Sequence, residues 1–284
     1  SIGWLWDAGR VSYEKNGDFI DTWYGQTKTK APDSFSLFHE HAYQGVGFYS
    51  HYKVAGNGAI EPFFAWKNSL FHDVVPEENL YYYGARFYEK DFHGFNCDFT
   101  YIRESGDIGD KGVRAYGYVA KEGYGFQKIF MKPNLVIGRV FASGNDNPNN
   151  DTIGTFSTPF GSTDGPHYGR MDIMSWSNLV DNQVNLYLTP LENLHVKIAY
   201  HNFSLDKWQD KWRYYGYMNK PGNRYTHLGD EVDLQLKYNY SKALEFQFIY
   251  THFTAGDFVK YNVEDSNAQR VFLQCTYRFH LLSS

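Results

Sequence analysis

Positively charged side chains recur along the chain, on segments in which every second residue is polar. The guanidinium group of arginine is planar and permanently charged, and it can meet a carboxylate with two parallel hydrogen bonds. Carboxylates stand among these cations and would keep an anion from binding too tightly to leave. The residue types therefore predict reversible binding of anionic groups. The candidate binding residues are Arg10, Arg86, Arg114, Lys197, Lys237, Arg270, Arg278, Glu231, Asp233 and Tyr116.

The elements that must position these residues are predicted to be β-strands. In residues 231–240 (EVDLQLKYNY), polar and apolar side chains alternate without exception. Side chains of a strand point to opposite faces in turn, so this segment has one polar face and one apolar face. Similar alternation occurs in residues 95–101, 183–188, 194–200, 244–250 and 270–279. Weaker candidates are residues 5–14, 18–28, 44–54, 58–68, 80–91, 111–121, 132–142 and 168–175.

The connections between these roughly fourteen strands alternate between short and long, and aromatic residues stand near many strand ends. Aromatics make up 19% of the chain, which excludes a disordered protein. Strands of about ten residues, short turns at one end and long loops at the other are typical of an outer-membrane β-barrel. The sequence therefore predicts an all-β, transmembrane, antiparallel up-and-down barrel. A soluble β-sandwich that binds carbohydrate remains the alternative, because its strands also alternate.

Other classes of function find no support in the composition. The net charge of −5 offers no basic surface for nucleic acid. The two cysteines, Cys97 and Cys275, are too few for a disulfide scaffold, and we expect free thiols on the apolar face. The pair His39 and His41 lacks a third metal ligand, and residues 145–151 lack the EF-hand spacing, so a hydrogen-bonded loop is expected there. No Gly-x-Ser-x-Gly motif occurs. We therefore expect no enzyme, no metal and no cofactor.

A specific pattern lies in residues 141–154 (FASGNDNPNNDTIG), followed by Thr155-Phe156 and His167-Tyr168-Gly169. It resembles the signature of the alginate-export family of outer-membrane proteins. Similar segments are found at residues 178–181, 200–203, 229–234 and 252–258, and residues 6–11 are similar to a strand near the start of that family's barrel.

The resemblance implies one outer-membrane β-barrel domain over residues 1–284. The family's barrel has about eighteen strands, within the range of bacterial barrels. Because no strand precedes the segment at residues 6–11, we expect this chain to be the carboxy-terminal part of a larger barrel. A smaller barrel that closes with about fourteen strands is the alternative.

The resemblance also implies a function in the outer membrane of a Gram-negative bacterium. The expected activity is a channel, embedded in outer-membrane lipid, that passes an alginate-like anionic polysaccharide or a related anionic solute. Periplasmic export partners would supply the polymer. Lumen cations would offset the cost of desolvating its carboxylates, and Tyr116, Tyr118 and Tyr187 would stack on sugar rings. For each single charge, an ion pair that braces the wall is the alternative. A general small-solute porin or a structural barrel subunit of a larger envelope complex is the alternative function.

Overall fold

The computed structural model describes residues 6–28, 41–54, 56–70, 77–159, 168–212 and 216–279. Its strands form one 14-stranded sheet in which neighbours follow chain order, apart from the two-residue β9, which pairs parallel with β7. All other pairings are antiparallel, which confirms the predicted all-β, up-and-down fold class. The strands are β1 (Trp6–Lys15), β2 (Asp18–Lys28), β3 (His41–Lys53), β4 (Gly58–Ser69), β5 (Glu78–Phe92), β6 (Phe95–Ile108), β7 (Lys111–Gly125), β8 (Asn134–Ala142), β9 (Thr152–Ile153), β10 (Leu179–Leu191), β11 (Leu194–Ser204), β12 (His227–Asn239), β13 (Leu244–Ala255) and β14 (Ala268–Tyr277).

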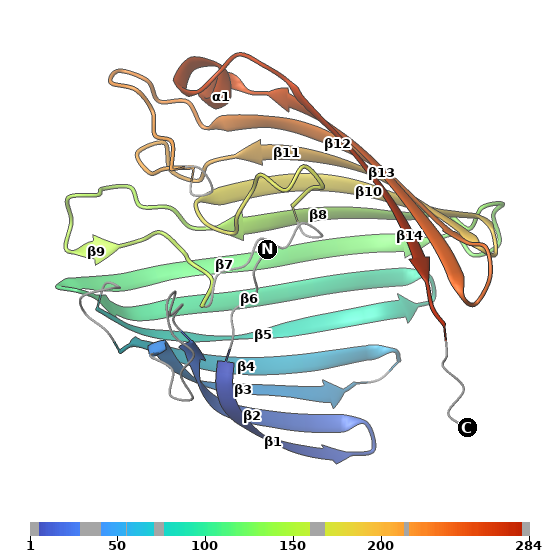
Figure 1. Cartoon of the computed structure of the whole chain (residues 1–284), viewed down its shortest axis with the longest axis horizontal. Coiled ribbons are helices and arrows are strands. Elements are labelled where there is room, and N and C mark those ends of the chain that lie inside the picture. Colours follow the sequence, from blue (N-terminus) through green and yellow to red (C-terminus); the bar gives the residue numbers. More distant parts are fainter. Residues whose placement is uncertain are drawn as a thin grey trace.

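The connections gather by length at the two ends of the sheet. Long loops lie at one end, on the left of Figure 1, and short turns at the other. At the short-turn end, Asn16 and Gly17 have φ angles of 57° and 82°, as a two-residue type I′ hairpin turn requires. His93 and Gly94 repeat this geometry with φ angles of 55° and 90°. A tight turn joins β6 to β7 at the long-loop end, and an eight-residue connection joins β7 to β8 at the short-turn end, so the predicted alternation of lengths holds with two exceptions.

The sheet is strongly curved, and its first and last strands lie nearer the viewer than its middle strands in Figure 1. We call the concave side the inner face and the convex side the outer face. On β12, Glu231 and Asp233 lie on the inner face and are fully buried, whereas Val232 between them is 46% exposed. Leu273 and Phe246, on the outer face of β14 and β13, are 74% and 42% exposed. Ionic residues therefore point inward and apolar residues outward on these strands, as predicted.

Strand β7 has the opposite orientation to the one predicted. Arg114 and Tyr116 were expected on the inner face, but the register places them beside Ser105 and Arg103 on the outer face, and Tyr118 joins them there. The small residues between them turn inward, because loop side chains cover the inner face at this level. At Gly117, an added Cβ atom would lie only 3.0 Å from the ring of Trp176. The expectation that Arg114, Tyr116 and Tyr118 line the lumen was wrong.

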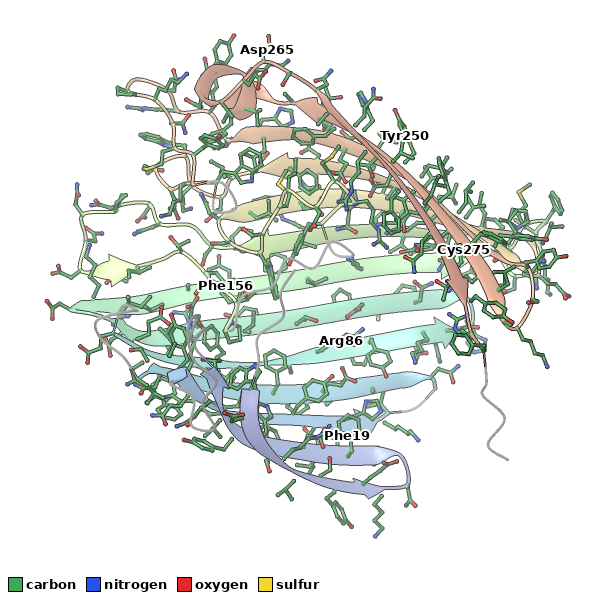
Figure 2. All side chains as sticks on the ribbon, in the orientation of Figure 1. Phe19, Arg86, Phe156, Tyr250, Asp265 and Cys275 are labelled. Carbon is green, nitrogen blue, oxygen red and sulfur yellow. The ribbon has the colours of Figure 1, made fainter. Side chains whose placement is uncertain are left out.

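The long-loop half of the inner face carries a hydrophobic core. Loops between the strands fold back over the inner face, together with the short helix α1 (Asp257–Asn262). Figure 2 shows Phe156 in this region and Arg86 midway along β5, outside it. Among the described residues no helix is long and apolar enough to cross a membrane. The core includes Leu80, Tyr82, Val113, Ala115, Val140, Phe156, Tyr168, Met171, Met174, Phe203, Trp212, Phe253 and Phe258.

One predicted strand is absent. Residues 168–175 form an irregular segment with bends, which lies over the inner face and pairs with no strand. Its alternating sequence resembles a strand, but its backbone N–H groups at Arg170 and Met171 bond to the side chain of Glu231 instead of a neighbouring strand. We call residues 168–175 the strap.

Candidate functional site

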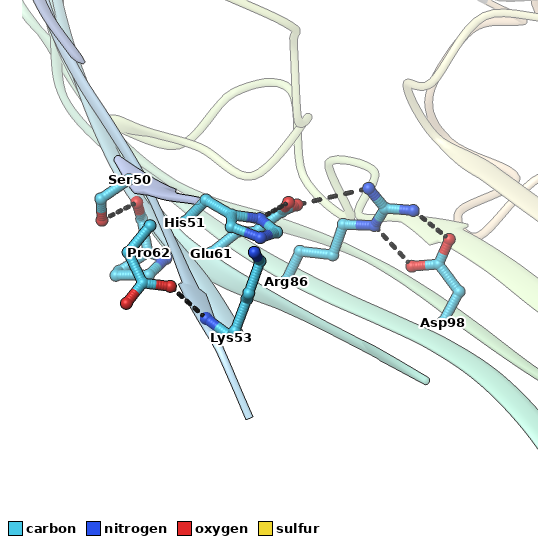
Figure 3. Close-up of polar contacts among 8 residues, drawn as sticks. Ser50, His51, Lys53, Glu61, Pro62, Arg86 and Asp98 are labelled. Carbon is cyan, nitrogen blue, oxygen red and sulfur yellow. Dashed lines mark hydrogen bonds and ion pairs between the residues drawn. The ribbon is translucent and has the colours of Figure 1, made fainter. Parts of the chain in front are cut away.

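An ionic network of the inner face centres on Arg86 in β5 (Figure 3). Its Nε and Nη2 atoms donate to the two oxygens of Asp98, each at 2.8 Å, and Nη1 lies 3.3 Å from Glu61 Oε2. Glu61 Oε1 lies 2.8 Å from His51 Nδ1. The network ties β3, β4, β5 and β6 together. Arg86 therefore lies on the inner face, as predicted, with its charge already paired.

Several other predicted cations also lie on the inner face and are engaged. Arg10 pairs with Asp21 at 2.5 Å, and Lys237 and Arg278 both lie 3.2 Å from Glu245 Oε2. Arg270 Nη1 donates to the carbonyl oxygens of Arg170 and Met171, at 3.2 and 3.3 Å. These contacts match the alternative in which single lumen charges brace the wall.

Three cations of the inner face differ from these, because within the described residues their charged groups form neither an ion pair nor a side-chain hydrogen bond. They are Lys121 on β7, Arg170 in the strap and Lys197 on β11, and we call them the basic cluster. Lys197 lies close enough to Lys121 and Arg170 to be repelled by both, while Asp181 and Asp233 attract it. The wall allows this crowding, because Gly138 opposite Lys121 leaves room for the lysine stem.

A tyrosine ring completes the surroundings of the basic cluster. Tyr187 lies opposite Lys197 in the register of β10 and β11, and the Lys197 Nζ atom is 5.6 Å from the ring centroid. A cation over an aromatic face is attracted by the ring quadrupole. The arrangement presents positive charge and a flat apolar surface side by side on the inner face, which are the features that bind a carboxylated sugar ring.

The predicted carboxylates Glu231 and Asp233 lie beneath the strap. Glu231 Oε1 accepts the N–H groups of Arg170 at 2.5 Å and Met171 at 2.9 Å. The hydroxyl of Thr251 donates to Asp233 Oδ1 at 2.5 Å. Both side chains are fully buried. Glu231 therefore fastens the strap to β12.

The signature loop that follows β8 is fixed by two aspartates from the loop after β11. The N–H of Gly144 donates to Asp206 Oδ2 at 3.0 Å, and the N–H of Asn145 donates to Asp210 Oδ2 at 2.9 Å. The hydroxyl of Thr155 also donates to Asp210 Oδ2, at 2.5 Å. Asp210 therefore clamps the start and the end of the signature loop.

The expected hydrogen-bonded loop at residues 145–151 is confirmed. The amide of Asn147 donates to Asn150 Oδ1 at 2.8 Å, and the N–H of Asn149 donates back to Asn147 Oδ1 at 3.1 Å. The described residues hold no group of three or more His, Cys, Asp or Glu side chains placed to bind a metal ion. His39 and Glu40 lie outside the described residues.

A family model described as alginate export matches residues 20–274, which include the signature loop, most of β2, all strands from β3 to β13 and most of β14. The chain belongs to the alginate export family. The resemblance stated from the sequence is thereby confirmed. No curated protein matches the chain.

In this member of the alginate export family, the predicted site residues separate into four groups. The engaged group on the inner face contains Arg10, Arg86, Lys237 and Arg278, which pair with carboxylates, and Arg270, which donates to backbone carbonyls. Lys197 belongs to the basic cluster, Glu231 and Asp233 lie under the strap, and Arg114 and Tyr116 lie on the outer face.

Two members of the basic cluster were missed from the sequence. Lys121 was missed because the faces of β7 were reversed, and Arg170 because the strap was taken for a strand. The small residues Ala115, Gly117 and Gly123, which share a face with Lys121, were the available indication that this face of β7 is covered.

Proposed function

We propose that this protein is a channel in the outer membrane of a Gram-negative bacterium that passes an anionic polysaccharide of the alginate type outward by diffusion. The observation that carries the proposal is the basic cluster. Three cations gather on the inner face without a described ion pair or side-chain hydrogen bond, whereas Arg86, Lys237 and Arg278 pair with carboxylates and Arg270 donates to backbone carbonyls. Such a channel needs neither a cofactor nor a catalytic residue.

The chemistry of a polyuronate fits this cluster. Each sugar carries a carboxylate that loses hydration on entering a narrow lumen, and fixed cations offset that cost. Lys121, Arg170 and Lys197 supply the charge, and Tyr187 supplies a surface for the sugar ring. Asp181 and Asp233 lie nearby and weaken the attraction, which favours passage over retention.

Under the same proposal the outer face contacts lipid. Exposed aromatic residues stand near strand ends on that face, among them Tyr13, Tyr81, Tyr124 and Tyr277. Aromatic girdles at both membrane interfaces are typical of outer-membrane barrels. The short-turn end then faces the periplasm, where assembly partners supply the polymer.

The test is single-channel recording in planar bilayers with sodium oligouronates. We expect anion selectivity in the wild-type channel and concentration-dependent block by oligouronates. Lys197→Gln is expected to weaken the block about tenfold, equivalent to about 1.4 kcal/mol. Lys67→Gln is the matched control, because Lys67 is also a lysine of the inner face but pairs with Glu78 at 2.6 Å.

Strong cation selectivity without block by oligouronates would refute the proposal. Equal permeability to neutral sugars and uronates would instead identify a general small-solute porin. An equal effect of Lys197→Gln and Lys67→Gln would show that total lumen charge, and not the basic cluster, controls the block.

A further inference from the structure

Three arginines lie on the outer face of adjacent strands. Arg103 on β6 pairs in register with Tyr116 on β7, Arg114 pairs with Ser105, and Arg139 on β8 pairs with Ala120. All three positions are on the outer face, whereas the other arginines of the described strands lie on the inner face. We call Arg103, Arg114 and Arg139 the outer arginine patch.

The outer arginine patch borders a panel of stacked aromatic rings. The rings of Tyr101 and Tyr116 lie 6.3 Å apart, those of Tyr116 and Phe141 5.2 Å apart, and those of Tyr118 and Phe141 5.1 Å apart. Their interplanar angles of 29°, 29° and 14° make this a nearly continuous flat surface. Arg103 lies directly opposite Tyr116 in the register of β6 and β7. Arg114 is two residues from Tyr116 along β7, and Arg139 is two residues from Phe141 along β8.

The charges of the patch are unmatched. Arg114 and Arg139 are exposed and Arg103 is half-buried, yet none of the three forms an ion pair with a described carboxylate. The carboxylates Asp107 and Glu122 lie on the same face of these strands but do not pair with the three arginines. An unpaired guanidinium on a lipid-facing wall is costly unless an anion from the membrane meets it.

A hollow of about 460 Å³ opens beside Arg139, on the side toward the short turns. Its outer-face wall includes Phe99, Ala120, Ile137 and Val184, which form an apolar channel. Asn182, Tyr200 and Asn202 add polar groups on the long-loop side, and Glu122 lies toward the short turns. The outer arginine patch therefore lies on the long-loop side of a mostly apolar hollow. A lipid with an anionic headgroup on the long-loop side and an acyl chain toward the short turns has the same order of charged and apolar parts.

We infer that this surface binds a phosphate-bearing glycolipid of the outer leaflet. Its phosphates bind the outer arginine patch, its sugars lie on the aromatic panel, and one acyl chain enters the hollow. Arginine suits this role because its planar fork meets phosphate oxygens with two hydrogen bonds. The inference rests on the proposed location in the outer membrane, where long loops lie at the external side. It is independent of what the channel transports.

The test measures binding of purified diphosphorylated lipid A to the detergent-solubilised protein by native mass spectrometry. The variant is the triple substitution Arg103→Gln, Arg114→Gln and Arg139→Gln. The matched control is Lys15→Gln, Lys128→Gln and Lys242→Gln, which removes three exposed cations near the short turns. We expect at least tenfold weaker binding in the variant and less than a twofold change in the control. Lipid A without phosphates is expected to bind the wild type at least tenfold more weakly.

Three results would overturn the inference: unchanged binding by the triple variant, equal binding of lipid A without phosphates, or displacement of lipid A by an equal concentration of inorganic phosphate. Block by oligouronates, recorded on the same variant, is expected to be unchanged. A failure of the glycolipid inference is therefore distinguishable from a failure of the proposed channel. Heat-dependent mobility in gels shows whether the variant is folded. If the triple variant fails to fold, Arg114→Gln alone is tested with the same probes, because the exposed Arg114 side chain forms no hydrogen bond or ion pair with a described residue.

Discussion

Replacing Glu231 by alanine is expected to loosen the strap while leaving β12 intact. The carboxylate of Glu231 accepts two backbone N–H groups of the strap, at 2.5 and 2.9 Å, and a fully buried position shields these bonds from water. Gly169 beside them has a φ angle of +87°, and an added Cβ atom there would lie 2.4 Å from the Glu231 carboxylate. The strap is therefore shaped to approach this side chain closely.

The size of the effect follows from the two hydrogen bonds that alanine removes. A hydrogen bond contributes about 0.5–1.5 kcal/mol net, so the loss of both costs about 1–3 kcal/mol. A loss of about 2 kcal/mol corresponds to about a thirtyfold change in the opening equilibrium. We expect the amides of Arg170 and Met171 to exchange hydrogen between about fivefold and 150-fold faster in Glu231→Ala.

The assay is hydrogen exchange followed by mass spectrometry on peptides that cover residues 168–175. Glu245→Ala is the matched control, because Glu245 is also a glutamate of the inner face but pairs with Lys237 and Arg278 and not with the strap. Exchange in the strap is expected to change less than twofold in this control. Equal exchange in Glu231→Ala and wild type, or equal acceleration by Glu245→Ala, would refute the view that Glu231 fastens the strap.

Three further predictions test other parts of the structure. Asp210→Ala removes the acceptor of the Asn145 N–H and of the Thr155 hydroxyl, and it is expected to destabilise the docked signature loop by about 2–4 kcal/mol. The measurement is proteolysis within residues 143–156, which should become faster. Unchanged cleavage would contradict the view that Asp210 holds both ends of the loop. Leu273→Arg on the outer face is expected to lower the free energy of unfolding by about 2–4 kcal/mol, as measured by urea titration in vesicles. Gln274→Arg on the inner face is expected to lower it by less than about 1 kcal/mol. The reverse order would show that the two faces are assigned wrongly. N-Ethylmaleimide is expected to label the exposed Cys275 at least tenfold faster than the buried Cys97, and equal rates would contradict the placement of these thiols.

The alternation of residues predicted the strands well where the two faces differ in chemistry. On β12 each inward residue from Glu231 to Lys237 is polar and each outward residue is apolar, so a single orientation is possible. The short turns were predictable for a related reason, because Asn16 and Gly17 tolerate the positive φ angles of a type I′ turn. These features depend on neighbouring residues alone.

The orientation of β7 could not be predicted in the same way. The inner face of β7 carries mostly small and aliphatic residues, and its outer face carries tyrosine, alanine and charged residues. Neither face is clearly the polar one. The deciding factor is the contact of Gly117 with Trp176, about sixty residues away in the sequence. The prediction of a strand at residues 168–175 was wrong for a comparable reason. The backbone of this segment bonds to the side chain of Glu231, which is distant in the sequence, and not to a neighbouring strand.

The two halves of the inner face explain why charge alone is a poor guide to the binding residues. In the long-loop half, the inner face is apolar and is covered by loops, so the ionisable side chains there find hydrogen-bond partners in the loops. Glu104 is an example, because the N–H and the hydroxyl of Ser157 both donate to its carboxyl group at 2.8 Å. In the other half most cations meet a carboxylate across the sheet, which braces the curved wall. Only a cation that both halves leave unmatched can offer its full charge to a passing anion, because a paired cation must first lose its carboxylate. Lys197 and its neighbours Lys121 and Arg170 meet this condition, and the residues that control the block are expected among them.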